Sequence, residues 1–172
     1  MKRALLHWKK SGVNTMLGKI HTRRIPPLFN QDFKEFIESL NANQVRYLII
    51  GGYAVALHGH PRYTKALDVW VECSRENAEA LIQALTQFGM GSLGLTVEDF
   101  LEPDQVVQLG NPPNRIDIFV AVSGVEFADC YPQGVKISLD GGEVKFIDLV
   151  NLKKNKKASG RMQDLADLEN LE

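Results

Sequence analysis

The chain has 172 residues, of which 44% are hydrophobic and 24% are charged, and its formal net charge is −1. This length and composition predict one globular domain with a buried core, and the total charge indicates no particular class of partner. The chain has no apolar run of about 18 residues and no apolar signal core near its start, so neither a membrane span nor secretion is predicted. Its two cysteines, Cys73 and Cys130, lack metal-type spacing and indicate the reduced thiols of a cytoplasmic protein.

The charges are unevenly distributed along the chain. Residues 1–30 contain seven Lys and Arg side chains and no Asp or Glu, whereas residues 31–172 are acidic in sum. We therefore expect a basic N-terminal arm over residues 1–30 and a single domain over residues 31–172. A basic arm attracts nucleic acid phosphates or an acidic protein. A solvated terminus without a partner explains the same composition.

Hydrophobic periodicity and turn residues predict a chain in which helices and strands are interspersed. Helices are expected over residues 31–42, 53–58, 76–88, 147–157 and 162–171. Strands are expected over residues 45–50, 67–72, 106–109, 115–120, 135–139 and 143–146. Ser74 is a suitable N-cap for the helix over residues 76–88, and Gly89 is a suitable end for it. Residues 90–103 are expected to form a loop with one helical turn near residues 97–101.

Two adjacent glycines, Gly51 and Gly52, separate a predicted buried strand from a predicted short helix. Without side chains, the backbone at these positions can approach a phosphate closely. Free amides at the start of the following helix would favour the anion. Because many strands end in glycine, this pair taken alone is only a weak indication of phosphate binding.

Asp68 and Asp117 each lie in a predicted strand with apolar neighbours. A carboxylate in a buried strand is costly unless it is paired or binds a metal ion. The residue two positions before Asp68 shares its face of the strand. Carboxylates at these three positions, on two adjacent strands, could hold two Mg²⁺ ions that bridge triphosphate oxygens and activate a hydroxyl. Alternatively, the two aspartates are structural and form salt bridges with Arg62 or Lys65.

These features are more specific in combination. A hydrophobic residue and Gly51-Gly52 are followed by 13 residues, then by position 66, a hydrophobic residue and Asp68. Asp117 follows much later, between two isoleucines. This arrangement resembles the nucleotidyltransferase superfamily with the polymerase-beta-like fold. The resemblance implies an α/β (α+β) fold with a mixed central sheet flanked by helices.

The resemblance covers roughly residues 32–170. Arg62, Thr64 and Lys65, just before the acidic positions, are further marks of it. The segment 155–168 is similar to that of small bacterial nucleotidyltransferases related to toxin–antitoxin and abortive-infection proteins. This segment favours that narrower group within the superfamily.

The resemblance also implies roles for the matching residues. Asp68 would ligate a metal ion, and Asp117 would ligate metal and accept the proton of the incoming hydroxyl. The residues implied on the triphosphate side are Gly51, Gly52, Arg62, Thr64 and Lys65. Lys156 and Arg161 would reach the nucleotide or its acceptor, although a solvated helix face explains residues 153–157 equally well.

Ala66 departs from the family pattern, because members of the superfamily carry Asp or Glu as the first metal ligand at this position. Alanine cannot coordinate a cation. Two explanations compete: an engineered inactivating substitution, or a natural member that binds nucleotide without catalysis. The intact surroundings, with Thr64, Lys65, Asp68 and Asp117 in place, favour the engineered substitution.

The sequence therefore predicts a nucleotidyltransferase that uses Mg²⁺ and transfers a nucleoside monophosphate from a nucleoside triphosphate (NTP) to a hydroxyl. The acceptor hydroxyl would belong to RNA, such as a tRNA 3′ end, or to a protein, and Ala66 would impair the reaction. The alternative is a non-catalytic protein that binds nucleotide or RNA as one half of a toxin–antitoxin pair.

Overall fold

The computed structural model of this chain describes residues 2–4, 29–139 and 142–171. Most of the expected basic arm and residues 140–141 of the expected hairpin turn lie outside the described residues, so the predicted boundary between arm and domain stays a prediction. None of the helices in the described ranges combines the length and apolar character needed to cross a lipid bilayer.

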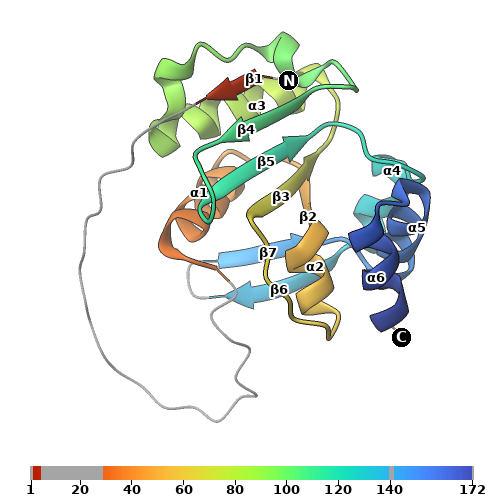
Figure 1. Cartoon of the computed structure of the whole chain (residues 1–172). Helices are drawn as coiled ribbons and strands as arrows, with labels where there is room; N and C mark the ends of the chain where they lie inside the picture. Colours follow the sequence, from red (N-terminus) through yellow and green to blue (C-terminus); the bar gives the residue numbers. More distant parts are fainter. Residues whose placement is uncertain (1, 5–28, 140–141, 172) are drawn as a thin grey trace, which may run out of the picture.

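A mixed sheet forms the centre of the fold, with the strand order β1-β4-β5-β3-β2-β7-β6 (Figure 1). The strands are β1 (Lys2–Ala4), β2 (Tyr47–Ile50), β3 (Ala66–Val71), β4 (Val106–Leu109), β5 (Arg115–Phe119), β6 (Val135–Leu139) and β7 (Gly142–Phe146). β3 is parallel to β5 and antiparallel to β2, and β4 is antiparallel to β5. The expected mixed central sheet is confirmed.

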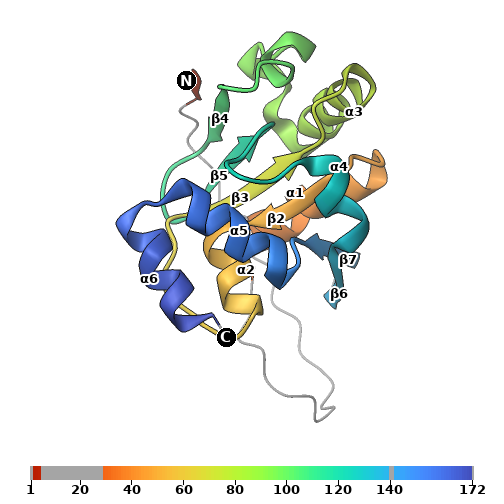
Figure 2. The same ribbon diagram turned by 90° about the vertical axis from the view of Figure 1, so that its right-hand side faces the viewer.

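Helices lie on both sides of this sheet. They are α1 (Gln31–Ala42), α2 (Gly51–Leu57), α3 (Arg75–Leu85), α4 (Phe127–Cys130), α5 (Leu149–Ser159) and α6 (Met162–Asn170). Figure 2 shows α5 and α6 side by side in front of the strands, whereas α1 and α3 lie away from them across the sheet. The expectation of a sheet flanked by helices is therefore also confirmed.

Local sequence signals account for most element boundaries. The Ser74 side chain accepts a hydrogen bond from the Asn77 backbone amide and begins α3 as an N-cap. After α3, one wider helical turn, Thr86–Met90, contains Gly89 at a φ of 94°, which ends the helix. The expected helical turn in the following loop is confirmed as Val97–Phe100.

Three of the differences from the sequence prediction bear on the fold. α2 begins at Gly51, two residues earlier than expected, so both glycines belong to its first turn. α4 has only four residues, too short for periodicity to reveal it. Lys2–Ala4, within the expected basic arm, forms β1 and pairs with β4 at the edge of the sheet.

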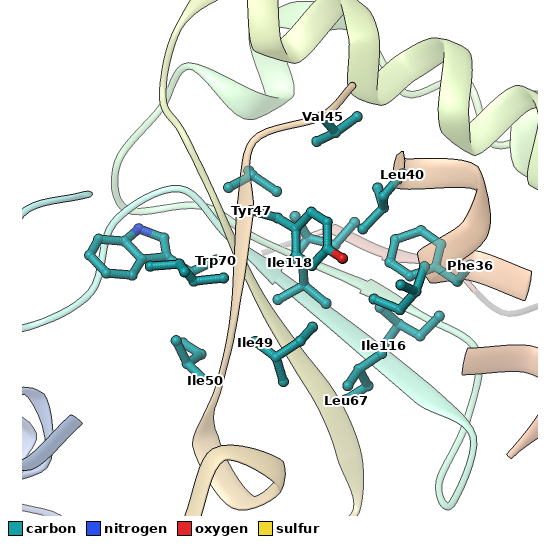
Figure 3. Close-up of a cluster of buried hydrophobic side chains, with 14 of the residues drawn as sticks. Phe36, Leu40, Val45, Tyr47, Ile49, Ile50, Leu67, Trp70, Ile116 and Ile118 are labelled. Carbon is teal, nitrogen blue, oxygen red and sulfur yellow. The ribbon is translucent and has the colours of Figure 1, made fainter. Parts of the chain in front are cut away.

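The alternation of side chains along β3 and β5 separates an apolar face from a polar one. Leu67, Ile116 and Ile118 are fully or almost fully buried and lie on the α1 side, near Phe36 (Figure 3). Asp68 and Asp117 project from the opposite face, because successive side chains of a strand alternate. That opposite face is the one that α5 approaches, and the polar residues of the two strands lie there.

Candidate functional site

A cleft of about 380 Å³ lies between the polar face of β3 and β5 and the helix α5. Eight of the ten residues that the sequence indicated as site residues line this cleft. They are Gly51, Thr64, Lys65, Ala66, Asp68, Asp117, Lys156 and Arg161. Residues far apart in the sequence therefore converge on one hollow.

Asp68 and Asp117 lie directly beside each other, because they are register partners on the parallel strands β3 and β5. The Arg115 guanidinium donates from Nε to Asp117 Oδ1 and from Nη2 to Asp117 Oδ2, both over 2.8 Å. Within the described residues, Asp68 makes no hydrogen bond or ion pair. The alternative that Arg62 or Lys65 pairs with these aspartates is wrong for Asp117, whose partner is Arg115.

The two neighbouring carboxyl groups have perturbed ionisation. Burial, and secondly the negative charge of Asp117, raise the pKa of Asp68 to about 7. Burial also raises the pKa of Asp117, although hydrogen bonds from Arg115 and Gln108 oppose the shift. An aspartate with a pKa near neutrality inside a cleft is typical of a functional site, and structural ion-pair networks produce the same effect.

Gly51 makes the close approach of Asp68 possible. Its φ is +64°, and a Cβ atom at this position would lie 1.9 Å from Asp68 Oδ2. A side chain at residue 51 would therefore collide with the carboxylate and would also be strained by the backbone conformation. The glycine leaves its own backbone exposed to the cleft next to Asp68.

Gly52 and Arg62 do not line the cleft. A Cβ atom on Gly52 would lie 2.7 Å from the Thr64 Cβ atom, so this glycine allows close packing of the loop before β3. Arg62 pairs with Asp167 of α6 through two hydrogen bonds of 2.6 and 2.8 Å. A contact of Arg62 or Gly52 with nucleotide stays a prediction.

Lys156 and Arg161 reach the cleft as members of an ion-pair cluster built on α6. Lys156 Nζ lies 2.7 Å from Asp164 Oδ1 and 2.8 Å from Asp167 Oδ2, and all three side chains are at most 3% exposed. Arg161 donates from Nε to Asp164 over 2.7 Å, with its side chain 76% exposed. A solvated helix face is thus excluded for Lys156, whereas Lys157 is exposed as that alternative expects.

Ala66 lines the cleft on the same face as Asp68, where it offers no metal ligand. Its register partner on β5 is Arg115. Among residues 2–4, 29–139 and 142–171, no group of three or more His, Cys, Asp or Glu side chains could hold a metal ion. A pair of Mg²⁺ ions needs several carboxylate oxygens, and here both oxygens of Asp117 are taken by Arg115. The side chains present therefore do not fit a two-metal centre.

A second hollow, of about 430 Å³, adjoins the cleft and shares Ala121 and Val122 with it. Its acidic lining residues are Glu72, Glu76 and Glu126. Trp70 also lines it, and its indole packs edge-on against Phe127 of α4 with ring centroids 5.2 Å apart. Trp70 therefore walls this neighbouring hollow.

Sequence reasoning missed Arg115 and the acidic residues of α6. Arg115 precedes Asp117 by two residues in a strand, and this spacing places the two side chains on one face and could have indicated the pair. Asp164 and Asp167 lie three residues apart on one helix face, which could have indicated a joint role. Arg161 precedes Asp164 by three residues, whereas Lys156 and Arg62 come from other elements, which spacing alone does not reveal.

The fold is similar to that of a solved structure. The chain is similar to the crystal structure of an antigenic nucleotidyltransferase-like protein from Paracoccidioides brasiliensis, with a TM-score of 0.47 and 18% sequence identity. The match covers 82% of this chain and 76% of that chain. No family model matches the sequence, and no curated protein sequence matches it. A likeness at this level carries no argument about activity.

Proposed function

We propose that this chain is a nucleotidyltransferase-type protein that binds the triphosphate of an NTP in the cleft between β3, β5 and α5. Its ability to transfer the nucleoside monophosphate to a hydroxyl is impaired, because position 66 carries no carboxylate. The observation that carries the proposal is the register pairing of Asp68 with Asp117. It brings the half-buried carboxyl group of Asp68 and the buried one of Asp117 together in the lining of a polar cleft, with Asp68 beside Gly51.

The cleft offers separate groups for each part of such a ligand. Lys65 is exposed and makes no ion pair with any described residue, and Arg161 extends its guanidinium into solvent at the same opening. These two cations would contact the phosphates, and the Gly51 backbone allows a close approach. Asp117 would accept the proton of the incoming hydroxyl.

The acceptor hydroxyl would enter from the second hollow, because the two hollows share Ala121 and Val122. Glu72 pairs there with Arg46, and the carboxylates of Glu76 and Glu126 leave the entrance acidic in sum, so it would repel an RNA backbone. We therefore favour a protein hydroxyl over a tRNA 3′ end as the acceptor. RNA remains the acceptor that the basic residues 1–30 would favour.

A second candidate function is non-catalytic binding of nucleotide or RNA as one half of a toxin–antitoxin pair. Two observations favour it: Ala66 supplies no ligand, and Arg115 occupies both oxygens of Asp117. When its ligand is a nucleotide, the second candidate requires an NTP in the same cleft as the first, and the two then differ only in whether transfer follows.

The variant Ala66→Asp tests the proposed activity. A carboxylate at position 66 would lie beside Asp68 on the cleft face and could complete a site for Mg²⁺. A metal ligand of this kind contributes about 3 to 5 kcal/mol to transition-state stabilisation, or about two to four decades in rate. We expect Mg²⁺-dependent label transfer from radiolabelled NTPs to RNA or protein with Ala66→Asp at a rate higher by this factor.

Ala66→Asn is the matched control, because Asn has the shape of Asp without its charge. Transfer by Ala66→Asp and not by Ala66→Asn supports the enzyme. NTP binding by all three forms without any transfer supports the non-catalytic candidate. If none of the forms binds an NTP, the enzyme and the nucleotide-binding form of the second candidate are both refuted.

A further inference from the structure

The position opposite the missing carboxylate is occupied by a cation of the protein itself. Ala66 and Arg115 are register partners on β3 and β5, so the two residues are neighbours on the cleft face. Adjacent strands lie only about 4.8 Å apart. The Arg115 side chain is 27% exposed and lines the cleft, so its guanidinium is accessible to a bound ligand.

This guanidinium is a positive charge that contacts both carboxylate oxygens of Asp117, as a metal ion bound there would. Its Nε and Nη2 atoms donate to the two different oxygens of Asp117, and the Asp117 side chain is only 6% exposed. Gln108 adds a further hydrogen bond to the same carboxylate. A bidentate, partly buried pair of this kind is among the stronger charge-assisted interactions in proteins. A divalent cation at Asp117 would first have to displace it.

Arg115 has donors left for a second partner. A guanidinium carries five N–H groups, and Asp117 accepts only two of them. Lys65 and Arg161 line the same cleft and supply further positive charge. Planar guanidinium groups also suit phosphate oxygens, which they bind through paired hydrogen bonds.

We propose that Arg115 takes the place of the divalent cation, so that this cleft binds the triphosphate of an NTP without a metal ion. The inference rests on the proposed function, since it presumes that an NTP occupies the cleft. The ligand would be the metal-free NTP, and Arg115 would bridge Asp117 and the phosphates.

Calorimetric titration of the full chain with ATP, GTP, CTP and UTP, each in excess EDTA and each in excess Mg²⁺, tests the proposal. We expect the preferred NTP to bind with dissociation constants that agree within about threefold in the two conditions. Binding that requires Mg²⁺ would overturn the inference and leave the proposed function standing. Absence of binding in both conditions would refute the proposed function itself.

Arg115→Gln sharpens the test, because it frees Asp117 to bind a metal ion. We expect this variant to bind the NTP at least about tenfold more weakly in EDTA and to recover when Mg²⁺ is added. Titration with Mn²⁺ alone should show binding to Arg115→Gln and none to the unmodified chain. Unchanged NTP binding by Arg115→Gln in EDTA would contradict the proposed role.

Two further variants control for effects on folding and on surface charge. Arg115→Gln/Asp117→Asn removes both charges of the pair and should bind the NTP weakly in EDTA and in Mg²⁺ alike. Arg75→Gln removes an arginine whose pair with Glu98 is exposed and away from the cleft, and it should bind like the unmodified chain. If Arg75→Gln weakened binding as much as Arg115→Gln does, the effect would be one of general charge and the proposal would fail.

Discussion

At the scale of single residues, the candidate site depends on a glycine as much as on its acids. Asp68 reaches its place because Gly51 has no side chain, and the carboxylate fills the space where a Cβ atom would lie. Burial and the neighbouring Asp117 then raise the pKa of Asp68 to about 7. The absence of a side chain at Gly51 and the register pairing of Asp68 with Asp117 together produce the acidic centre of the cleft.

Gly51→Ala tests this close packing. The new methyl group would meet Asp68 Oδ2 at 1.9 Å, on a backbone with a φ of +64°. We expect a loss of about 2 to 4 kcal/mol in the free energy of unfolding, from left-handed backbone strain and overpacking together. Urea denaturation followed by circular dichroism measures the loss.

Gly94→Ala is the matched control, because Gly94 has a φ of +66° and a Cβ atom at this position would meet no described atom within 4 Å. It carries the backbone strain alone, of about 1 to 2 kcal/mol. Equal losses in the two variants would show that Asp68 does not pack against residue 51 as described.

At the scale of elements, α6 fixes the basic residues that reach the cleft. Asp164 and Asp167 of this helix bind Lys156 of α5, and they also bind Arg161 and Arg62. Residues from the loop before β3, from α5 and from the start of α6 are therefore held together by two carboxylates. The orientation of Lys156 and Arg161 toward the cleft follows from this cluster.

Lys156→Met tests the contribution of the cluster to stability. The substitution leaves two buried carboxylates without their shared ammonium group. We expect the free energy of unfolding to fall by about 3 to 5 kcal/mol at neutral pH. Lys157→Met, which removes an exposed lysine from the same helix, should change it by less than about 1 kcal/mol.

The pH dependence of this loss separates a charge effect from a packing effect. Burial raises the pKa of Asp164, but hydrogen bonds from Arg161 and Lys156 outweigh burial and lower this pKa from 3.8 to about 2. A lowered acid pKa stabilises the fold above the unfolded value, and this stabilisation is lost as the pH falls toward the folded value. The difference between Lys156→Met and the unmodified chain should therefore shrink as the pH falls from about 4 to about 2. A constant difference would point to packing.

How much of this could be predicted differs between the elements. The apolar neighbours of Asp68 and Asp117 indicated buried strands. The spacing between the Gly51-Gly52 pair and the acidic positions indicated that the aspartates share one site, and the strand register places the two aspartates side by side. The pairing of Arg115 with Asp117 was missed because Arg62 and Lys65, just before the acidic positions, offered more obvious partners. The cluster on α6 was missed because Lys156 and Arg62 come from other elements, and sequence periodicity describes only one element at a time.

At the scale of the whole molecule, one mixed sheet has core packing on one face and the cleft on the other. Its apolar face packs on the α1 side and contributes to the core, while its polar face meets α5 and forms the cleft. The adjoining acidic hollow lies on the same side as the cleft, because the two share lining residues. Under the proposed function, the cleft would hold the nucleotide and the adjoining hollow would admit the second substrate.

A crystal structure of the chain grown with its preferred NTP tests the central claim most directly. We predict that the triphosphate lies in the cleft and passes beside Gly51. Its phosphate oxygens should contact Lys65, Arg115 and Arg161. An NTP bound elsewhere, or an empty cleft at a saturating NTP concentration, would contradict the account.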